Sequence, residues 1–290
     1  MRVLVVTAVA AERDAVTRGT ARANAPADGP AETAESAVPG FVLHRTATAA
    51  GPFPLVVDAL AAGVGPAAAA AGAATALTAA AVSGGPYDLV VSAGIGGGFT
   101  GAAAQAPVGS LVVSDAIVAA DLGAETPEGF LPVTELGFGT VEHLPPEPLV
   151  RAVARATGAR RGEVLTVSTV TGSAERARAL VRLRPGALIE AMEGFGVAEA
   201  AAAHGVPVLE LRAVSNPVGP RDRAAWRIGD ALAALADAFA ALPAALAEAG
   251  AEVFPHVAAA GPHVLPDGRP TDPQGAPASA APSPHARRTP

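Results

Sequence analysis

The chain contains no cysteine and no lysine, and aromatic residues make up only 3% of its 290 positions. The absence of cysteine excludes disulfide bonds, thiolate zinc sites and cysteine nucleophiles. The absence of lysine excludes a P-loop lysine and a lysine that forms a Schiff base with a substrate. Acidic residues outnumber basic residues, 27 to 20, so the formal net charge at pH 7 is −7. A chain of this charge offers no basic footprint, so we expect no nucleic-acid partner.

Patterns typical of metal-dependent and serine hydrolases are missing too. The histidines show no H-E-x-x-H or comparable ligand spacing, and there is no G-x-S-x-G elbow. No stretch of about 20 apolar residues, unbroken by glycine or proline, suggests a membrane span. The apolar run in residues 1–9 is too short for a signal peptide and is expected to form a core strand. We therefore predict a cytoplasmic protein with no membrane association, no metal and no cofactor.

Half of the residues are hydrophobic, which is enough to bury a large core. Runs rich in valine and leucine alternate with alanine-rich segments of helical character. This alternation predicts an α/β fold, a three-layer sandwich with a central mixed, mostly parallel sheet flanked by helices. The predicted strands are 2–9, 41–48, 55–61, 88–93, 110–119, 164–170, 187–190 and 206–214, and the predicted helices are 66–81, 146–157, 174–183, 193–204 and 223–249.

We expect one domain over residues 1–250. Residues 18–40 are dense in alanine, proline, glycine and acidic residues without periodicity, which predicts a flexible surface insertion. Residues 251–290 form a tail rich in proline and alanine without an apolar face, and we expect it to be disordered. Neither segment is expected to carry catalysis.

Two glutamates occupy positions that favour chemistry. Glu12 follows the first predicted strand, at the carboxyl end where open α/β sheets bind ligands. Glu193 follows Met192 at the start of a predicted helix, beside another short buried strand. Both acids also suit a first helical turn without any function. As functional groups, Glu12 can polarise a water molecule and Glu193 can accept hydrogen bonds from ribose hydroxyls, while Met192 either packs on the sugar or fills the core.

A glycine-rich segment at residues 94–98 follows a predicted strand and is expected to form a turn. It fails the dinucleotide-binding fingerprint, because the third required glycine falls on Phe99 and a suitable acidic residue is missing. Glycines also let backbone N–H groups approach a ligand closely. We therefore expect Ile95, Gly96 and Gly97 to contact the sugar and base of a substrate.

The order of these segments resembles the purine nucleoside phosphorylase and nucleosidase superfamily, especially its methylthioadenosine/S-adenosylhomocysteine nucleosidase branch. The match extends from residue 1 to about residue 245. Within the superfamily, residues 215–223 together with 226–228 resemble the futalosine hydrolases of the futalosine route to menaquinone. The segments that carry the wider resemblance are 7–12, 63–66, 92–98, 191–198 and 212–216.

This resemblance implies an N-ribosyl hydrolase that needs no cofactor and forms a homo-oligomer, a dimer or larger. It implies that Glu12 activates water, and that Glu193 binds the ribose hydroxyls and stabilises the oxocarbenium-like transition state. Phosphorolysis would need a cationic phosphate clamp, and residues 8–13 offer only Arg13. Water is thus the expected nucleophile, with a phosphorylase, a methylthioadenosine-type nucleosidase and a non-catalytic nucleoside-binding protein as alternatives.

Asn216 is expected to select the base. The adenine-specific nucleosidases have aspartate at this place, whereas an amide can donate to O6 of a 6-oxopurine and accept from a ring N–H. This favours futalosine as substrate, with hypoxanthine and dehypoxanthine futalosine as products. The alternative role of Asn216 is an Asx turn before Pro217, and both roles can coexist. Ser215 is expected to contact the substrate beside it.

Arg221 and Arg223, with Arg227 nearby, form a cluster of arginines after the asparagine. Such a cluster is often a solvated surface or a partner of acids such as Asp222. Guanidinium groups also suit bidentate capture of a carboxylate, and futalosine carries one on its benzoate end. We therefore include Arg221 and Arg223 among the candidate substrate-binding residues.

Overall fold

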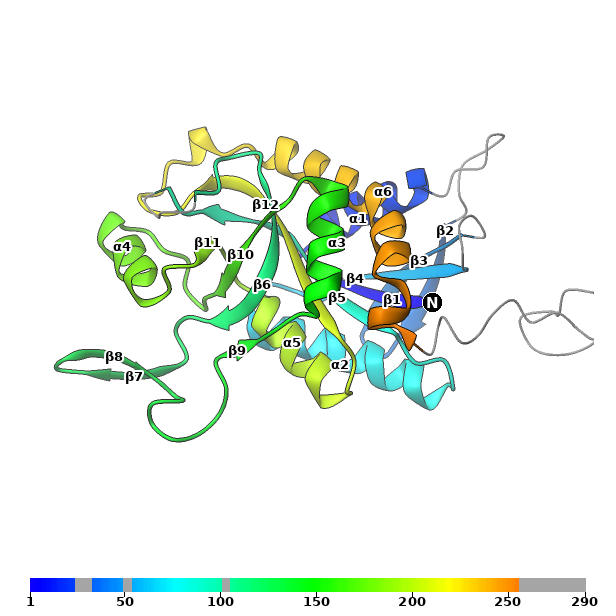
Figure 1. Ribbon diagram of the computed structural model, residues 1–290, viewed down its shortest axis with the longest axis horizontal. Coiled ribbons are helices and arrows are strands. Elements are labelled where there is room, and N and C mark those ends of the chain that lie inside the picture. Colours follow the sequence, from blue (N-terminus) through cyan, green and yellow to red (C-terminus); the bar gives the residue numbers. More distant parts are fainter. Residues whose placement is uncertain (24–32, 49–53, 101–104, 256–290) are drawn as a thin grey trace, which may run out of the picture.

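The computed structural model describes residues 1–23, 33–48, 54–100 and 105–255, and all structural statements below refer to these residues. They form a central mixed sheet with helices on both faces, which confirms the predicted fold class (Figure 1). The strands are β1 (Arg2–Thr7), β2 (Thr33–Val38), β3 (Phe41–Thr48), β4 (Leu55–Ala61), β5 (Leu89–Gly98), β6 (Leu111–Ala119), β7 (Gly123–Thr126), β8 (Gly129–Pro132), β9 (Glu142–His143), β10 (Arg160–Thr166), β11 (Ala187–Ala191) and β12 (Val208–Pro217). The helices are α1 (Ala10–Ala23), α2 (Pro66–Val82), α3 (Glu147–Thr157), α4 (Ala174–Leu183), α5 (Gly194–Ala203), the short 3₁₀ helix η1 (Arg223–Ala225) and α6 (Ile228–Val253).

The sheet combines an open half with a closed half. Its order is β11-β10-β6-β12-β5-β1-β4-β3-β2, and β11 also pairs with β5. The strands β11, β10, β6, β12 and β5 therefore close on themselves, whereas β1 to β4 extend as an open sheet. This closure places β11 beside β5 and β12, and the site described below lies where these strands end.

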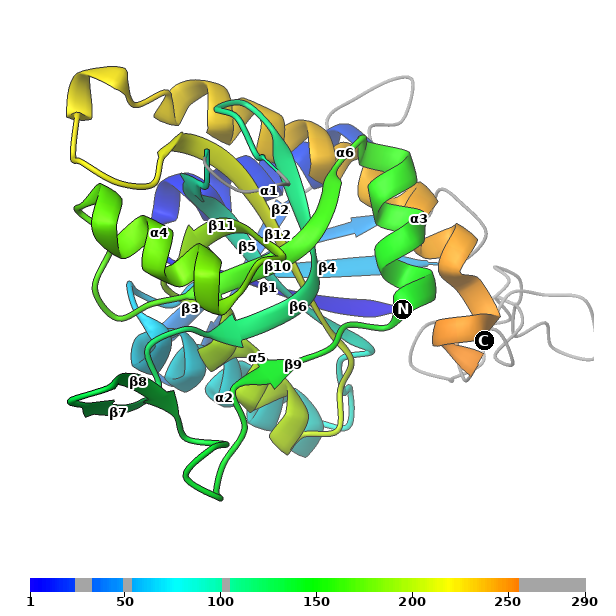
Figure 2. The ribbon, with the colours of Figure 1, turned by 60° about the vertical axis from the view of Figure 1, so that its left-hand side comes forward.

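Two apolar layers cover the sheet. α1, α3 and α6 pack on one face with core residues such as Val5, Leu209 and Phe239. α2 and α5 pack on the other face with Leu4, Val90 and similar side chains. Figure 2 shows the two groups of helices on opposite sides of the strands. Alternate residues of β1 point to opposite faces, so a strand covered on both sides is apolar at successive positions.

The glycine-rich segment at residues 94–98 is not a turn, as we had predicted, but the second half of β5. Its glycines allow neighbouring backbones to approach. A Cβ on Gly96 would lie 2.6 Å from the Glu190 carbonyl oxygen, and one on Gly98 would lie 2.1 Å from the Ala106 carbonyl oxygen. Glycine is therefore required here by close packing of strands.

The predicted boundaries of the two flexible segments also need correction. Residues 18–23 belong to α1, and β2 pairs in antiparallel fashion with β3, so ordered elements occupy both ends of the predicted insertion at 18–40. Residues 24–32 lie outside the described part. At the other end, α6 continues to Val253, and Phe254 is buried in the core, so the ordered fold includes the start of the predicted tail at 251–290. Residues 256–290 lie outside the described part.

The predicted helix at 223–249 is divided. Trp226 is extended and Arg227 is non-helical, so η1 and α6 are separate. α6 is long and apolar enough to cross a membrane by length and composition, although Pro243 interrupts its apolar sequence. Its side chains Leu235, Phe239 and Leu242 belong to the core beneath the sheet, which accounts for the apolar composition.

Candidate active site

A cavity of about 250 Å³ opens at the carboxyl ends of β1, β5 and β12, beside the end of β11. Open α/β sheets bind ligands at this edge, because the loops that follow parallel strands meet there. The structure brings together nearly all the residues that the sequence suggested. Those that line the cavity are Glu12, Ile95, Gly96, Gly97, Met192, Glu193, Ser215, Asn216 and Arg221.

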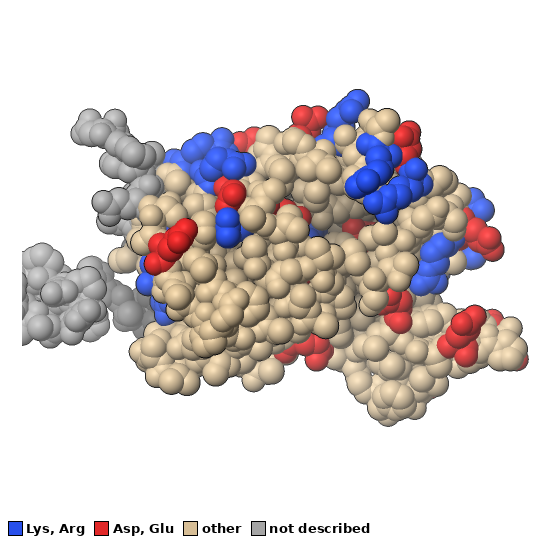
Figure 3. All heavy atoms as spheres, turned by 180° about the vertical axis from the view of Figure 1, so that it is seen from behind, with Lys and Arg blue, Asp and Glu red and all other residues tan. Residues whose placement is uncertain are grey.

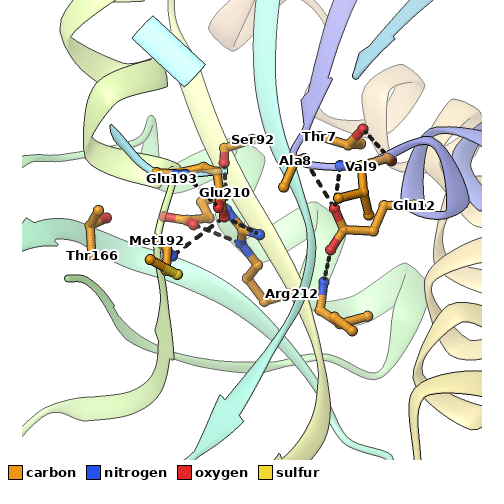
Figure 4. Close-up of polar contacts among 12 residues, drawn as sticks. Thr7, Ala8, Val9, Glu12, Ser92, Thr166, Met192, Glu193, Glu210 and Arg212 are labelled. Atoms are coloured by element: carbon orange, nitrogen blue, oxygen red, sulfur yellow. Dashed lines mark hydrogen bonds and ion pairs between the residues drawn. The ribbon is translucent and has the colours of Figure 1, made fainter. Parts of the chain in front are cut away.

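Glu12 lies in the first turn of α1 and is only 3% exposed. Its Oε2 accepts hydrogen bonds from the backbone N–H groups of Ala8 (3.0 Å) and Val9 (3.3 Å), and its Oε1 accepts one from Ile95 (2.9 Å) (Figure 4). Burial raises the pKa of Glu12, and nearby Arg212 opposes this shift. The carboxylate is thus fixed in direction and has increased basicity, as a general base requires.

Glu193 lies at the entrance to α5 and is 5% exposed. Its Oε1 accepts a hydrogen bond from the Gly65 N–H at 3.2 Å, and its Oε2 lies 3.1 Å from Arg212 Nη1. Gly65 has φ near +96°, a conformation that favours glycine, and it directly precedes α2. The segment that contains Gly65 thus contributes a backbone donor that orients Glu193.

Our sequence analysis did not single out Arg212, a buried cation in contact with Glu193. It lies on β12, is 1% exposed, and forms ion pairs with both Glu193 (3.1 Å) and Glu210 (2.8 Å). Its Nη2 donates to Ser92 Oγ at 3.0 Å. A signal was present in the sequence: Glu210 and Arg212 are two charges at alternate positions of an otherwise apolar strand, and alternate strand residues share one face.

Asn216 lines the cavity, but both ends of its amide already have local partners. Its Oδ1 accepts from Ser215 Oγ at 2.8 Å, and its Nδ2 donates to the Pro217 carbonyl oxygen at 3.0 Å. The pairing of β12 with β5 shifts register between Val214 and Asn216. A bulge of this kind re-aims side chains, and here both Ser215 and Asn216 reach the cavity. These bonds are not those of the predicted Asx turn, in which Oδ1 would accept from the Val218 N–H, because that N–H donates to the Gly98 carbonyl oxygen.

The arginine cluster is organised around an aromatic ring. The guanidinium groups of Arg221 and Arg223 lie 5.2 Å and 5.7 Å from the centre of the Trp226 ring. Trp226 and Arg221 line the cavity, whereas Arg223 does not. Figure 3 shows several basic side chains gathered along the upper part of the molecule seen from behind. The arrangement offers an apolar ring beside positive charge at one end of the cavity.

A third buried carboxylate, that of Glu190, forms part of the cavity wall. Glu190, on β11, accepts hydrogen bonds from both the backbone N–H (2.8 Å) and the hydroxyl of Thr171. Burial raises the pKa of Glu190, and the bonds from Thr171 oppose the shift. These bonds hold the segment around Thr171 against the sheet, so a flat ligand meets a fixed wall.

The site combines a buried base, a second carboxylate and a guanidinium around a cavity that an organic molecule can enter. Within the described residues, no group of three or more His, Asp or Glu side chains is arranged to hold a metal ion. Residues 8–13, which we considered as a phosphate clamp, contain one arginine, Arg13, and its guanidinium is paired with the carboxylate of Asp14 at 2.8 Å. The geometry suits attack of an activated water on a carbon that develops positive charge.

Comparisons with known proteins agree with this arrangement. The model of the phosphorylase superfamily matches residues 20–249. A futalosine hydrolase from Streptomyces coelicolor is 68% identical over 235 residues, which cover 81% of this chain and 92% of that protein. A futalosine hydrolase from Acidothermus cellulolyticus is 44% identical over 240 residues, with coverage of 80% and 86%.

Solved structures share the fold at low sequence identity. A methylthioadenosine/S-adenosylhomocysteine nucleosidase from Colwellia psychrerythraea, in complex with adenine, superposes with a TM-score of 0.66 at 18% identity, over 86% of this chain and 95% of that one. A futalosine hydrolase mutant from Helicobacter pylori superposes with a TM-score of 0.66 at 16% identity, over 83% and 98%.

Proposed function

The chain belongs to the phosphorylase superfamily and, within it, to the futalosine hydrolase family; from this premise we propose that it hydrolyses the N-glycosidic bond of futalosine. The products are hypoxanthine and dehypoxanthine futalosine, and the reaction serves menaquinone biosynthesis. The observation that carries the proposal is the pair of buried carboxylates, Glu12 and Glu193, that face one cavity.

In the proposed reaction, Glu12 removes a proton from a water molecule aimed at the anomeric carbon. Three backbone N–H groups hold its carboxylate in place, and burial raises its pKa above that of an ordinary glutamate, which makes it a better base. Glu193 accepts hydrogen bonds from the ribose hydroxyls, and its charge stabilises the oxocarbenium-like sugar as the bond to the base breaks. Arg212 fixes Glu193 from behind at 3.1 Å.

Recognition of a 6-oxopurine is assigned to Asn216. In the absence of substrate its amide is satisfied by Ser215 and Pro217, so binding of a base must share or exchange these bonds. Amide and hydroxyl groups have spare hydrogen-bonding capacity, since an amide carries two donors and two acceptor lone pairs. Ile95, Gly96, Gly97 and the Thr171 segment supply the remaining walls of the base and sugar pocket.

Recognition of the carboxylate at the far end of futalosine is assigned to Arg221, with Trp226 packing on the aromatic part. Arg223 does not line the cavity, but it shares the Trp226 ring and adds positive charge nearby. An arginine beside an aromatic face offers stacking for the ring and bidentate bonding for the carboxylate.

The proposal is tested by incubating purified protein with futalosine, aminofutalosine, inosine and methylthioadenosine, with and without phosphate, and separating the products by chromatography. The expected result is release of hypoxanthine from futalosine at a rate independent of phosphate. Phosphate-dependent release would identify a phosphorylase, and preferential release of adenine would identify a methylthioadenosine-type nucleosidase. Binding without release of any base would identify a nucleoside-binding protein.

We also propose that the protein is cytoplasmic and forms a homo-oligomer, a dimer or larger. Support for association comes from α2, which contains no charged residue and exposes Val82 at 84%. The part of the molecule where α2 lies carries almost no charged side chains (Figure 3). Light scattering on the purified protein measures the oligomeric state directly.

A further inference from the structure

Glu210 is a buried charge for which the reaction described above has no use. It lies on β12, is 0% exposed, and does not line the cavity. Burying a carboxylate costs free energy unless it is paired, and most buried polar groups have a hydrogen-bond partner. The partner here is Arg212, two residues along the same face of the strand.

The side chain of Glu210 lies between Arg212 and the start of α5. Its Oε1 accepts a hydrogen bond from Arg212 Nε at 2.8 Å, and its backbone N–H donates to Ser114 Oγ at 3.0 Å. Among the described residues its Oε2 has no hydrogen-bond partner. That oxygen faces the first residue of α5, since a Cβ on Gly194 would lie 2.0 Å from it. Glu210 thus lies between Arg212 and the start of the helix that follows Glu193.

The charges around Arg212 do not balance. Three carboxylates face one guanidinium: Glu12 from α1, Glu193 from the entrance to α5, and Glu210 from β12 itself. Its hydrogen-bond partner on β5 is the hydroxyl of Ser92, which carries no charge. With all three acids ionised, the cluster would carry a formal charge of −2 in a buried place. Buried like charges resist ionising together, so such a cluster titrates as a unit and retains a proton.

We propose that Glu210 is a positioning residue for the hydrolysis: it holds the guanidinium of Arg212 in register with Glu12 and Glu193, and its charge limits how strongly Arg212 attracts these two carboxylates. The proposal rests on the proposed function, because it assigns Glu210 a role through the base and the ribose-binding acid of that reaction. The proposal gives Glu210 a geometric role and a charge role, and different substitutions can separate the two.

The charge role has a definite sign. Removing the negative charge of Glu210 leaves the attraction of Arg212 less compensated, so the ionised form of Glu12 becomes more stable and its pKa falls. A base with a lower pKa is ionised at lower pH but accepts a proton less readily. The geometry agrees with such coupling, since Glu210 Oε1 lies 2.8 Å from Arg212 Nε, and burial raises the pKa of Glu210 while Arg212 opposes the shift.

The test compares Glu210→Gln and Glu210→Asp with wild type, by measuring kcat and KM for futalosine across pH. Gln keeps an acceptor for Arg212 Nε and removes the charge; we expect kcat to fall about 10-fold, KM to stay within about 2-fold, and the acid limb of kcat/KM to move down by about one pH unit. Asp keeps the charge but withdraws it by one methylene; we expect a similar loss of kcat with the acid limb unmoved.

Asp58→Asn is the matched control. Asp58 is also 0% exposed and is held by Arg45 (2.7 Å) and by the hydroxyl of Tyr87 (2.7 Å), but none of these residues lines the cavity. Its loss should lower the melting temperature and leave kcat and the pH profile unchanged. A wild-type profile for Glu210→Gln, an acid limb moved upward, or the same change in the control would overturn the proposal.

A readout without substrate separates this proposal from the proposed function. Because burial raises the pKa of Glu210 in the folded protein above that of a glutamate in the unfolded chain, its ionisation destabilises the fold as pH rises. The melting temperature of wild type should therefore fall more between pH 5 and about pH 8 than that of Glu210→Gln. Absence of base release by wild type would reject the proposed function alone, whereas parallel melting curves would reject the role of Glu210.

Discussion

Replacing Asn216 by aspartate changes a single atom pair and separates its two roles. Aspartate has nearly the same shape and keeps an oxygen that accepts from Ser215 Oγ, now at 2.8 Å. It loses the N–H group that donates to the Pro217 carbonyl at 3.0 Å, and it places a carboxylate oxygen against that carbonyl. This local hydrogen bond should therefore be lost, and the group that faces O6 of a 6-oxopurine should change from donor to anion.

The two effects have different magnitudes. Loss of one hydrogen bond at a partly exposed site costs about 1 kcal/mol. In a domain of this size, that lowers the melting temperature by about 2–4 °C. A mismatched polar contact with the substrate costs about 2–4 kcal/mol, which is a change of roughly 30- to 900-fold in relative kcat/KM.

The assay measures kcat/KM for futalosine and its 6-amino analogue in wild type and Asn216→Asp. We expect the ratio to move towards the 6-amino analogue, which can donate to a carboxylate. Ser215→Ala is the matched control, since it frees the amide oxygen of Asn216 but keeps its N–H donors. That variant should retain the preference for futalosine. An unchanged ratio in Asn216→Asp, together with a lower melting temperature, would refute base recognition and leave Asn216 with its local hydrogen bonds alone.

Four further predictions concern the site and the ordered core. Glu12→Gln and Glu193→Gln should each lower kcat by about 100-fold or more with the melting temperature little changed, and wild-type turnover in either would remove that residue from the mechanism. In wild type, activity should be lost as pH falls through the raised pKa of Glu12, so the acid limb of kcat/KM should lie above the range of an ordinary glutamate. Gly94→Ala should abolish activity even if the protein folds, because a Cβ would lie 2.6 Å from Glu12 Oε1; circular dichroism and turnover test this, and an active variant would contradict the close packing. Deletion of residues 256–290 should leave activity and melting temperature nearly unchanged. Phe254→Ala, by contrast, should destabilise the fold by about 3–5 kcal/mol, measured by denaturant titration, because Phe254 is buried. Equal stability of the two variants would show that Phe254 adds little to the core.

Much of the fold could be predicted because its signals are local. Buried strands such as β1 and β4 are runs of apolar residues, and α4 begins and ends where its sequence predicts. The rule that parallel strands direct their carboxyl ends to one edge was enough to place Glu12 with Asn216, because each follows or ends a strand. The sequence pattern also indicated the family, since the segments around the two glutamates occur in the order of that family.

Only the tertiary structure decided which residues contact one another in the site. Closure of β11 onto β5 turned the predicted glycine turn into a strand, and this depends on backbones that approach each other from distant parts of the chain. The short strand β9 was missed for the same reason, because it is defined by its pairing with β6 and not by a pattern in its own sequence.

The buried charges show the limit most clearly. Alternation along β12 indicates that Glu210 and Arg212 share a face, but only the packing of α5 and the neighbouring strands shows that this face is enclosed. The same two residues on an edge strand would be solvated and without consequence. Enclosure makes each charge depend on its partners, and those partners, Glu12 and Glu193, are brought within reach by the fold and not by proximity in the sequence.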